Sequence, residues 1–238
     1  MKHLPNALTL ANLFCGCCAL LSIFNGQPVV AAWFTAACFF FDYLDGMAAR
    51  ALGVQSPLGK ELDSLADVVS FGVVPGAMLY HLLNGQPATG GVSGASFIHI
   101  EALPAFVLSA FSAFRLAKFN LDTRQSNYFI GLTTPACTVL VLGLTLAAEN
   151  DRFGMAEIIR EPLFLYGLIG LLSWLLTSEI PMFGMKVKGF HWKENRLNLA
   201  FLVLFLVLIF FLKELSLTAI IVCYMVLSIA MKEKIIAT

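Results

Sequence analysis

Charged residues are scarce in this chain of 238 residues, and long polar stretches are missing. Only 13% of the residues are charged and 59% are hydrophobic, with a mean hydropathy of +0.83, whereas about a quarter of the residues in a soluble domain are charged. Apolar segments recur from end to end and leave no polar segment long enough for a separate soluble domain. The composition therefore predicts an integral membrane protein with one membrane domain.

The chain also lacks an excess of charge of either sign. Its 15 basic and 15 acidic residues cancel, so no overall basic surface indicates a nucleic-acid partner, and we expect none. The first 25 residues contain an apolar run that is typical of a secretory signal, but no clear small-x-small cleavage site follows it. We therefore expect this first segment to be retained as a helix.

No histidine accompanies the cysteine-rich stretch "CGCC" over residues 15–18. All six cysteines lie inside apolar runs, where thiols are more often small packing residues than metal ligands. We interpret these cysteines as packing residues.

Spanning helices need about 20 mostly apolar residues, because unpaired backbone groups cannot be left in lipid. The sequence predicts an all-α integral membrane protein with about eight transmembrane helices. The expected spans are 8–25, 28–50, 62–83, 99–118, 130–148, 161–180, 197–212 and 214–232. The last two are short and joined closely around Lys213 and Glu214, so we expect a hairpin or a kinked pair there.

The basic residues favour one orientation of these spans. With the N-terminus in the cytoplasm, twelve Lys and Arg residues fall in cytoplasmic segments and three, Arg152, Arg160 and Lys213, fall outside. Such a bias follows the positive-inside rule. We therefore predict a protein of the cytoplasmic membrane with both termini in the cytoplasm.

Four aspartates lie where charge is least favourable, in the segment "FDYLDGMAARALGVQSPLGKELDSLAD" over residues 41–67. Asp42 and Asp45 are three residues apart, and Asp63 and Asp67 are four apart, so each pair lies on one helix face. Because the second span begins at Pro28, it must continue through the first pair to cross a bilayer. Gly and Pro residues between the pairs predict a turn that aims all four carboxylates at one point.

Carboxylates this close would repel each other unless a cation lies among them. Salt bridges to Arg50 and Lys60 are one alternative, but two cations cannot neutralise four anions. Ligands that are all oxygen select hard cations, so we expect Mg²⁺ or Mn²⁺, with Ca²⁺ as a further option. Gly46 and Ala49 leave room beside the acids, and hard cations in such a site suit a phosphate or diphosphate.

The spacing of these residues resembles the signature of the CDP-alcohol phosphotransferase family, D-x2-D-G-x2-A-R-x8-G-x3-D-x3-D. All eight specified residues match, from Asp42 to Asp67. The resemblance implies a helical bundle with a core of six spans, usually dimeric, and a cavity open to the cytoplasm. On this basis we assign residues 1–196 to the core and residues 197–238 to a C-terminal transmembrane hairpin of the same membrane domain.

The resemblance also implies a role for each residue of the signature. The four aspartates would hold two divalent ions against the diphosphate of a CDP-linked donor, and Asp67 would be the general base. The residues expected near the cytidine nucleotide are Asp45, Gly46, Ala49 and Arg50.

Two further stretches resemble the phosphatidylserine synthase branch of this family. They are "PNALTLANLFCG" at residues 5–16, and "FRLAKFN" at 114–120 followed by "NYFIGLTTPA" at 127–136. This branch implies transfer of the phosphatidyl group from CDP-diacylglycerol to L-serine, with release of CMP. Where the branch usually has Gly-Leu-Pro, this chain has Gly131, Leu132 and then Thr133.

Several other polar residues are candidate contacts. Arg115, Lys118 and Asn120 are candidates for the acceptor, although the positive-inside rule would also place cations there. Thr9 and Asn12 are three apart on the first helix and are candidates for the nucleotide, or for joining helices. Lys60 is a candidate for a phosphate, or for an interfacial residue that reaches toward water.

Two alternatives remain open from the sequence. The same chemistry could use glycerol 3-phosphate or an inositol compound as acceptor, because glycerol 3-phosphate also requires cations in its site. A protein of another class, a divalent-cation transporter, could use the same acids as its conduction site.

Overall fold

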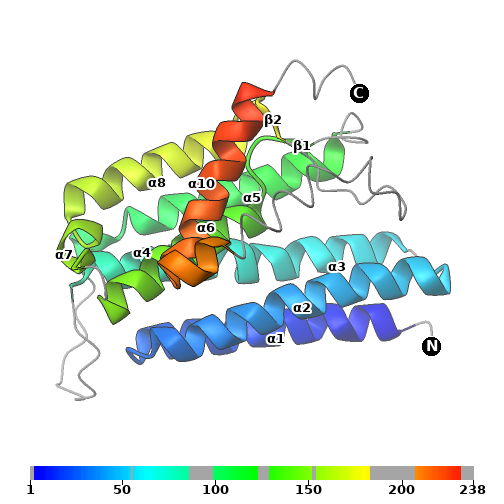
Figure 1. The fold of residues 1–238 in the computed structure, drawn as a ribbon. Helices are drawn as coiled ribbons and strands as arrows, with labels where there is room; N and C mark the ends of the chain where they lie inside the picture. The colour runs from blue at the N-terminus through cyan, green and yellow to red at the C-terminus, as the bar shows by residue number, and fades with distance from the viewer. Residues whose placement is uncertain are drawn as a thin grey trace.

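The computed structural model describes residues 3–54, 56–85, 99–122, 129–151, 154–182 and 207–231. These residues are almost entirely helical (Figure 1). The exception is a two-stranded antiparallel pairing of β1, Phe129–Ile130, with β2, Pro181–Met182. The all-α fold class predicted from the sequence is confirmed.

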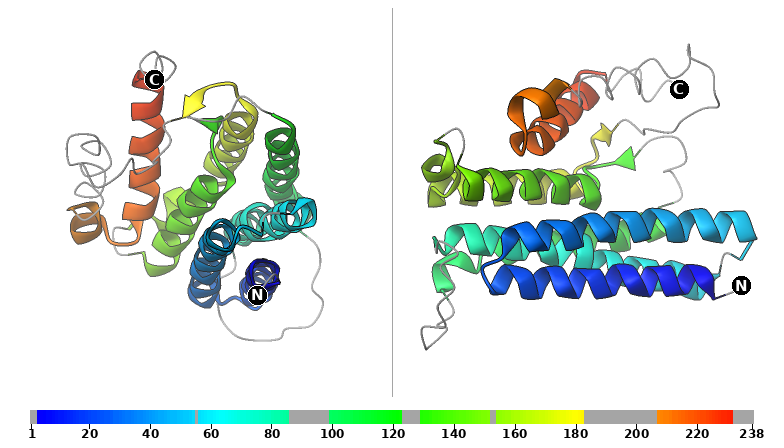
Figure 2. Two further views of the ribbon diagram at one scale, coloured as in Figure 1. Left: turned by 90° about the vertical axis from the view of Figure 1, so that its right-hand side faces the viewer. Right: turned by 60° about the horizontal axis from the view of Figure 1, so that its bottom comes forward.

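The first two helices form an antiparallel pair (Figure 2). Helix α1 spans Leu4–Phe24 and α2 spans Pro28–Leu52. Each begins with proline in its first turn, where the missing N–H costs no hydrogen bond. A short turn that contains Gly26 at φ 68° joins them. As predicted, α2 runs without interruption through both aspartates of the first pair.

The third span is a continuous helix with an irregular middle. Helix α3, Pro57–Asp67, leads into the π-helix η1, Val68–Val73, and then into α4, Val74–Leu83. Hydroxyl groups of neighbouring helices bind carbonyls of the π-helix: Ser109 donates to Gly72 O at 2.8 Å and Thr138 to Phe71 O at 3.1 Å. Single π-turns of this kind are frequent at functional sites.

The remaining helices match most of the predicted spans. The 3-10 turn η2, Ile100–Ala102, leads into α5, Ala105–Leu121, and α6 spans Thr134–Asn150. The short α7, Ala156–Ile159, precedes α8, Pro162–Thr177, and α10 spans Leu215–Ala230. The predicted span at 197–212 lies mostly outside the described residues.

Four helical segments of the described chain are long and apolar enough to cross a membrane: Leu4–Phe24, Pro28–Leu52, Pro57–Leu83 and Ile100–Leu121. Helices α6, α8 and α10 are shorter but also apolar. This pattern is that of an all-α integral membrane protein.

Close approaches of small residues hold the bundle together. The hydroxyl of Thr218 in α10 donates to Leu140 O in α6 at 3.0 Å, and an added Cβ at Gly143 would lie 2.7 Å from the backbone nitrogen of Thr218. Helix α10 therefore packs directly on the core. Cys15 and Cys38 are buried against Phe71, in agreement with their interpretation as packing residues.

A polar cluster lies at the end of the bundle where α4, α6 and α7 meet, opposite the N-terminus (Figure 1). Glu149 accepts a hydrogen bond from Arg160 at 2.8 Å and lies 3.3 Å from a ring nitrogen of His81. These contacts join three elements at the end of the molecule that is predicted to face outward.

Candidate active site

The two pairs of aspartates are brought together by the turn between α2 and α3. Helix α2 is followed by Gly53, which adopts the left-handed conformation at φ 62°, where glycine has no steric penalty. Helix α3 begins after Ser56, whose hydroxyl accepts a hydrogen bond from the Gly59 N–H at 3.0 Å. This N-cap and Pro57 at the first helical position start α3. The chain thereby reverses and sets α3 beside α1.

Three of the four aspartates form a compact carboxylate cluster. Asp42, Asp63 and Asp67 each offer one oxygen, and these oxygens lie within 4.8 Å of one another. All three side chains are half-buried. The expectation that four carboxylates would meet at one point therefore holds for three of them in this structure.

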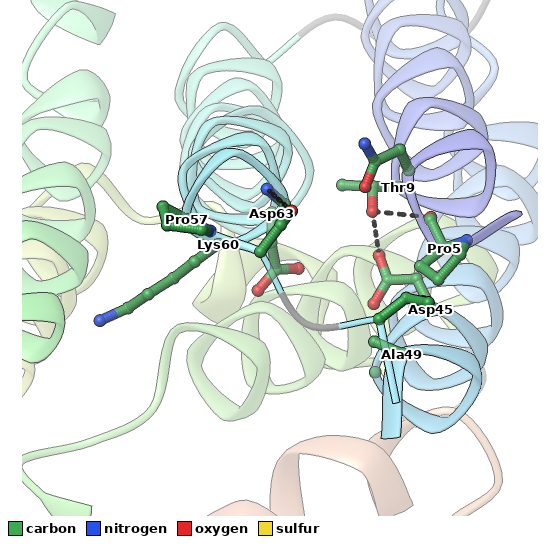
Figure 3. Close-up of a pocket in the computed structure, with 12 residues that line it drawn as sticks. Pro5, Thr9, Asp45, Ala49, Pro57, Lys60 and Asp63 are labelled. Carbon is green, nitrogen blue, oxygen red and sulfur yellow. Dashed lines mark hydrogen bonds between the residues drawn. The ribbon is translucent and has the colours of Figure 1, made fainter. Parts of the chain in front are cut away.

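The fourth aspartate, Asp45, lies in the wall of an adjacent cavity of about 560 Å³. Asp45 comes from α2 and Asp63 from α3, while Thr9 of α1 lies beside Asp45 (Figure 3). The Thr9 hydroxyl lies 2.6 Å from an Asp45 carboxylate oxygen and 3.0 Å from the carbonyl of Pro5. The cavity is lined by Pro5, Asn6, Thr9, Asp45, Gly46, Ala49, Val54, Ser56, Pro57, Gly59, Lys60 and Asp63.

Small residues keep this cavity open. Gly46 and Ala49 line it from α2. An added Cβ at Gly46 would lie 3.3 Å from a guanidinium nitrogen of Arg50, so the Arg50 side chain folds back along its own helix. An added Cβ at Gly59 would lie 3.2 Å from Ser56 Oγ and 3.3 Å from Asn6 Oδ1. Larger residues at either glycine would crowd polar groups at the cavity.

Lys60 lines the cavity but turns its ammonium group away from Thr9 and Asp45 (Figure 3). The ammonium donates to the Asn120 carbonyl at 3.1 Å. The side-chain amide of Asn120 in turn donates to Ser64 Oγ at 2.7 Å. Asn120 therefore joins the end of α5 to α3.

Arg115 and Lys118 are not among the residues that line this cavity. They line a second, much smaller pocket together with Leu176 and Thr177 from the last turn of α8 and with Ser178 just after it. Arg115 is buried, and its Nε has no hydrogen-bond partner among the described residues. Lys118 lies 3.7 Å from Glu179. Of the three candidate acceptor residues, Arg115 and Lys118 therefore lie at the small pocket beside α8, whereas Asn120 contacts α3.

Asn12 is completely buried and also does not line the cavity. Its amide group donates to a carboxylate oxygen of Asp67 at 3.4 Å. Its expected contact with a nucleotide remains a prediction, and the contact recorded in the structure is with the carboxylate cluster.

Sequence reasoning missed five residues of the cavity lining, Pro5, Asn6, Val54, Ser56 and Pro57, and gave no site role to Gly59, which belongs to the signature. A signal existed for two of them. Asn6 lies three residues before Thr9 and therefore on the same face of α1. Ser56 followed by proline is a typical helix start, which would have placed the beginning of α3 beside the acids.

The carboxylate cluster suits a hard divalent cation. Its donors are all oxygen, the ligand type that Mg²⁺, Mn²⁺ and Ca²⁺ prefer. One carboxylate oxygen of Asp63 is buried without a hydrogen-bond partner among the described residues, and a buried polar atom of this kind requires a partner. Asp42, Asp63 and Asp67 could therefore hold a metal ion.

Comparisons with known proteins agree with this arrangement. Residues 2–179 match the family model described as CDP-alcohol phosphatidyltransferase. The chain is 35% identical over 202 residues to a CDP-diacylglycerol–serine O-phosphatidyltransferase of Helicobacter pylori, covering 84% of this chain and 80% of that protein. It is 35% identical over 181 residues to the protein of the same name from Bacillus subtilis, covering 76% and 89%.

A yeast protein of the same name, from Saccharomyces cerevisiae, is 36% identical over 175 residues, covering 64% of this chain and 59% of the yeast protein. The family match includes the carboxylate cluster and the whole lining of the larger cavity. This chain belongs to the CDP-alcohol phosphatidyltransferase family.

Proposed function

We propose that this protein transfers the phosphatidyl group from CDP-diacylglycerol to the hydroxyl of L-serine and releases CMP. The observation that carries this proposal is the cluster of Asp42, Asp63 and Asp67 beside a cavity of about 560 Å³. The names of the relatives from Helicobacter pylori and Bacillus subtilis support serine as the acceptor. The product would be phosphatidylserine.

The cytidine nucleotide would occupy the larger cavity. Its volume lies within the range of about 300–1,000 Å³ that is usual for small-molecule sites. Gly46 and Ala49 would leave space for the nucleotide, with Asp45, Thr9 and Arg50 beside it. Lys60 would meet a phosphate only if its ammonium left the Asn120 carbonyl. The acyl chains of the donor would remain among the surrounding membrane lipids.

The aspartates would hold divalent metal, Mg²⁺ or Mn²⁺, with two ions in the complete site. Asp42, Asp63 and Asp67 are the candidate ligands from the cluster, and Asp45 is the fourth from the wall of the cavity. When bound, such ions neutralise a diphosphate and stabilise the charge that develops on its leaving group.

Asp67 would act as the general base. The serine hydroxyl oxygen forms a bond to the lipid-side phosphorus while the bond from that phosphorus to the CMP oxygen breaks, and CMP leaves with the electron pair. The hydroxyl proton passes to a carboxylate oxygen of Asp67. An alcohol has a high pKa, so a base within hydrogen-bond reach speeds this step.

Acceptor recognition is proposed for the C-terminal part of α5. Serine carries a carboxylate that requires a cation, and Arg115 and Lys118 are the nearby candidates, with Asn120 as a further hydrogen-bonding group. Asn120 donates a hydrogen bond to Ser64 of α3, the residue that follows Asp63 in the sequence. Arg115 is buried beside α8, so its contact with serine would require the small pocket to widen.

We further propose that the protein lies in the cytoplasmic membrane with its active site and both termini on the cytoplasmic side. The distribution of Lys and Arg supports this orientation. The family resemblance supports two further proposals. The protein would be a homodimer, and each chain would consist of a core at residues 1–196 and a transmembrane hairpin at residues 197–238.

A panel of acceptors tests the proposed function. The purified protein in detergent receives CDP-diacylglycerol, Mn²⁺ or Mg²⁺, and L-serine, glycerol 3-phosphate or inositol in turn, while CMP release is measured. CMP release only with serine, together with loss of activity in Asp67→Asn, is the expected result. Turnover with glycerol 3-phosphate and none with serine would contradict the proposed acceptor.

A further inference from the structure

Asn12 of α1 contacts Asp67, one of the three residues of the carboxylate cluster. It is a polar residue in the middle of an apolar helix, and it is completely buried. Its amide donates to Asp67 at 3.4 Å across 55 residues of sequence. Its own carbonyl oxygen Oδ1 is buried with no hydrogen-bond partner among the described residues.

The backbone of Asn12 is held from two further sides. Its main-chain carbonyl accepts hydrogen bonds from the Ser70 hydroxyl of η1 at 3.3 Å and from the Cys38 thiol of α2 at 3.5 Å. One turn later, an added Cβ at Gly16 would lie 2.6 Å from Ser70 Oγ, so only glycine allows α1 to approach η1 this closely. Helices α1, α2 and the α3–η1 junction therefore meet at Asn12.

The energetic balance of Asn12 does not favour a role in stability. Burying a polar atom without a partner costs about as much free energy as a hydrogen bond to a charged group contributes. The two effects of the side chain, the bond to Asp67 and the unpaired Oδ1, are thus of similar size and opposite sign. Stability alone therefore gives no reason for an amide at this position.

From this geometry we infer that Asn12 is a positioning residue for Asp67, an inference that rests on the proposed function of Asp67 as the base. The amide N–H holds one carboxylate oxygen of Asp67, which limits rotation of the carboxylate and presents the other oxygen to the acceptor hydroxyl. An amide cannot take up the transferred proton. The proton therefore stays on Asp67, and Asn12 keeps the carboxylate in one orientation before and after the transfer.

The 3.4 Å distance agrees with such a role. Hydrogen bonds of catalytic groups are often long without substrate and shorten in the reactive complex. Because the backbone of Asn12 is fixed by Ser70 and Cys38, a shift of Asp67 toward the amide is the movement available for shortening.

Asn12→Ala and Asn12→Thr test this inference by steady-state kinetics. Threonine has about the volume of asparagine, and its hydroxyl is too short to reach Asp67. We expect kcat to fall about 10- to 100-fold in both variants, since each tenfold loss corresponds to about 1.4 kcal/mol of transition-state stabilisation. The KM for CDP-diacylglycerol and the affinity for CDP by titration calorimetry should change less than threefold. The matched control is Ser22→Ala on the same helix, where the hydroxyl donates to Cys18 O at 2.8 Å.

A double variant separates action through Asp67 from an independent role. In Asp67→Glu the carboxylate is already displaced by one methylene, so adding Asn12→Ala should cost much less than it does in the wild type. Weaker CDP binding with kcat unchanged would overturn the inference and indicate a nucleotide contact. Full additivity with Asp67→Glu, or no kinetic change, would also overturn it. If the wild-type protein used glycerol 3-phosphate and not serine, the proposed acceptor would be wrong. The same fall in kcat of the Asn12 variants, measured with glycerol 3-phosphate, would still support Asn12 as a positioning residue for Asp67.

Discussion

The hydroxyl of Thr9 lies 2.6 Å from a carboxylate oxygen of Asp45, and this contact joins two helices at the wall of the larger cavity. Both residues are buried. The contact fixes the orientation of the one signature aspartate that stands apart from the carboxylate cluster.

Replacement of Thr9 should therefore weaken binding of the donor. A hydrogen bond to a charged group contributes about 1.5–3 kcal/mol, which is about 10- to 100-fold in an equilibrium constant. We expect Thr9→Val, which keeps the shape and removes the hydroxyl, to raise the KM for CDP-diacylglycerol by this factor. Thr9→Ser keeps the hydroxyl and should remain near the wild type. Equal kinetics in the two variants would contradict the assignment.

Removal of a carboxylate from the cluster should weaken metal binding and reduce activity. Asp63→Asn changes the residue whose buried oxygen has no partner among the described residues, and we expect CMP release to fall about 1,000-fold, since metal ions supply several kcal/mol of charge stabilisation. Titration calorimetry with Mn²⁺ should show weaker binding. Glu157→Gln, an exposed residue in α7, is the control.

Chelation of the wild-type protein is the complementary experiment. A chelator should stop CMP release, and added Mn²⁺ or Mg²⁺ should restore it, because the donors of the cluster are all oxygen. Full activity after exhaustive chelation would argue against metal at these aspartates.

Gly131 should be required for the stability of the junction between β1 and α8. Its φ is 73°, and an added Cβ would lie 2.9 Å from the carbonyl oxygens of Leu176 and Ser178. We expect Gly131→Ala to destabilise the protein by about 1–3 kcal/mol from backbone strain, with a further cost from the clash. Thermal unfolding in detergent measures the effect.

Gly170 provides a matched control in the adjoining helix. It lies within α8, and an added Cβ there would meet nothing within 4 Å. Gly170→Ala should leave the melting temperature unchanged or raise it, because alanine favours a helix by about 1 kcal/mol over glycine. A larger loss in Gly170→Ala than in Gly131→Ala would contradict this explanation.

Arg115 has two competing roles that kinetics can separate. If it binds the carboxylate of serine, Arg115→Gln should raise the KM for serine at least about tenfold, because such charge-assisted bonds are strong, while the KM for CDP-diacylglycerol stays unchanged. If Arg115 only stabilises the packing at the end of α8, the melting temperature of Arg115→Gln should fall without a change in either KM. Arg160→Gln, at the opposite end of the bundle, should affect stability alone.

The hydropathy pattern predicted most helices because the need to bury backbone groups in lipid forces long apolar runs to be helical. Helices α2 and α10 match their predicted spans to within two residues at both ends, whereas α1 begins four residues before its predicted start. The π-turn after Asp67 was not predicted, since its carbonyl partners, Ser109 and Thr138, come from distant helices. No local pattern in residues 68–73 indicates those partners.

By itself, the sequence determined that four aspartates lie at helical spacing on either side of a turn, a set of oxygen ligands that suits a hard cation, and its resemblance to the CDP-alcohol phosphotransferase signature indicated the transfer reaction. Spacing along one helix is a local property, so it can be read without a structure. Only the tertiary structure decided which groups meet. It brought oxygens of Asp42, Asp63 and Asp67 within 4.8 Å of one another, placed Arg115 beside α8, and brought Asn12 to Asp67, because such contacts depend on how the helices approach one another.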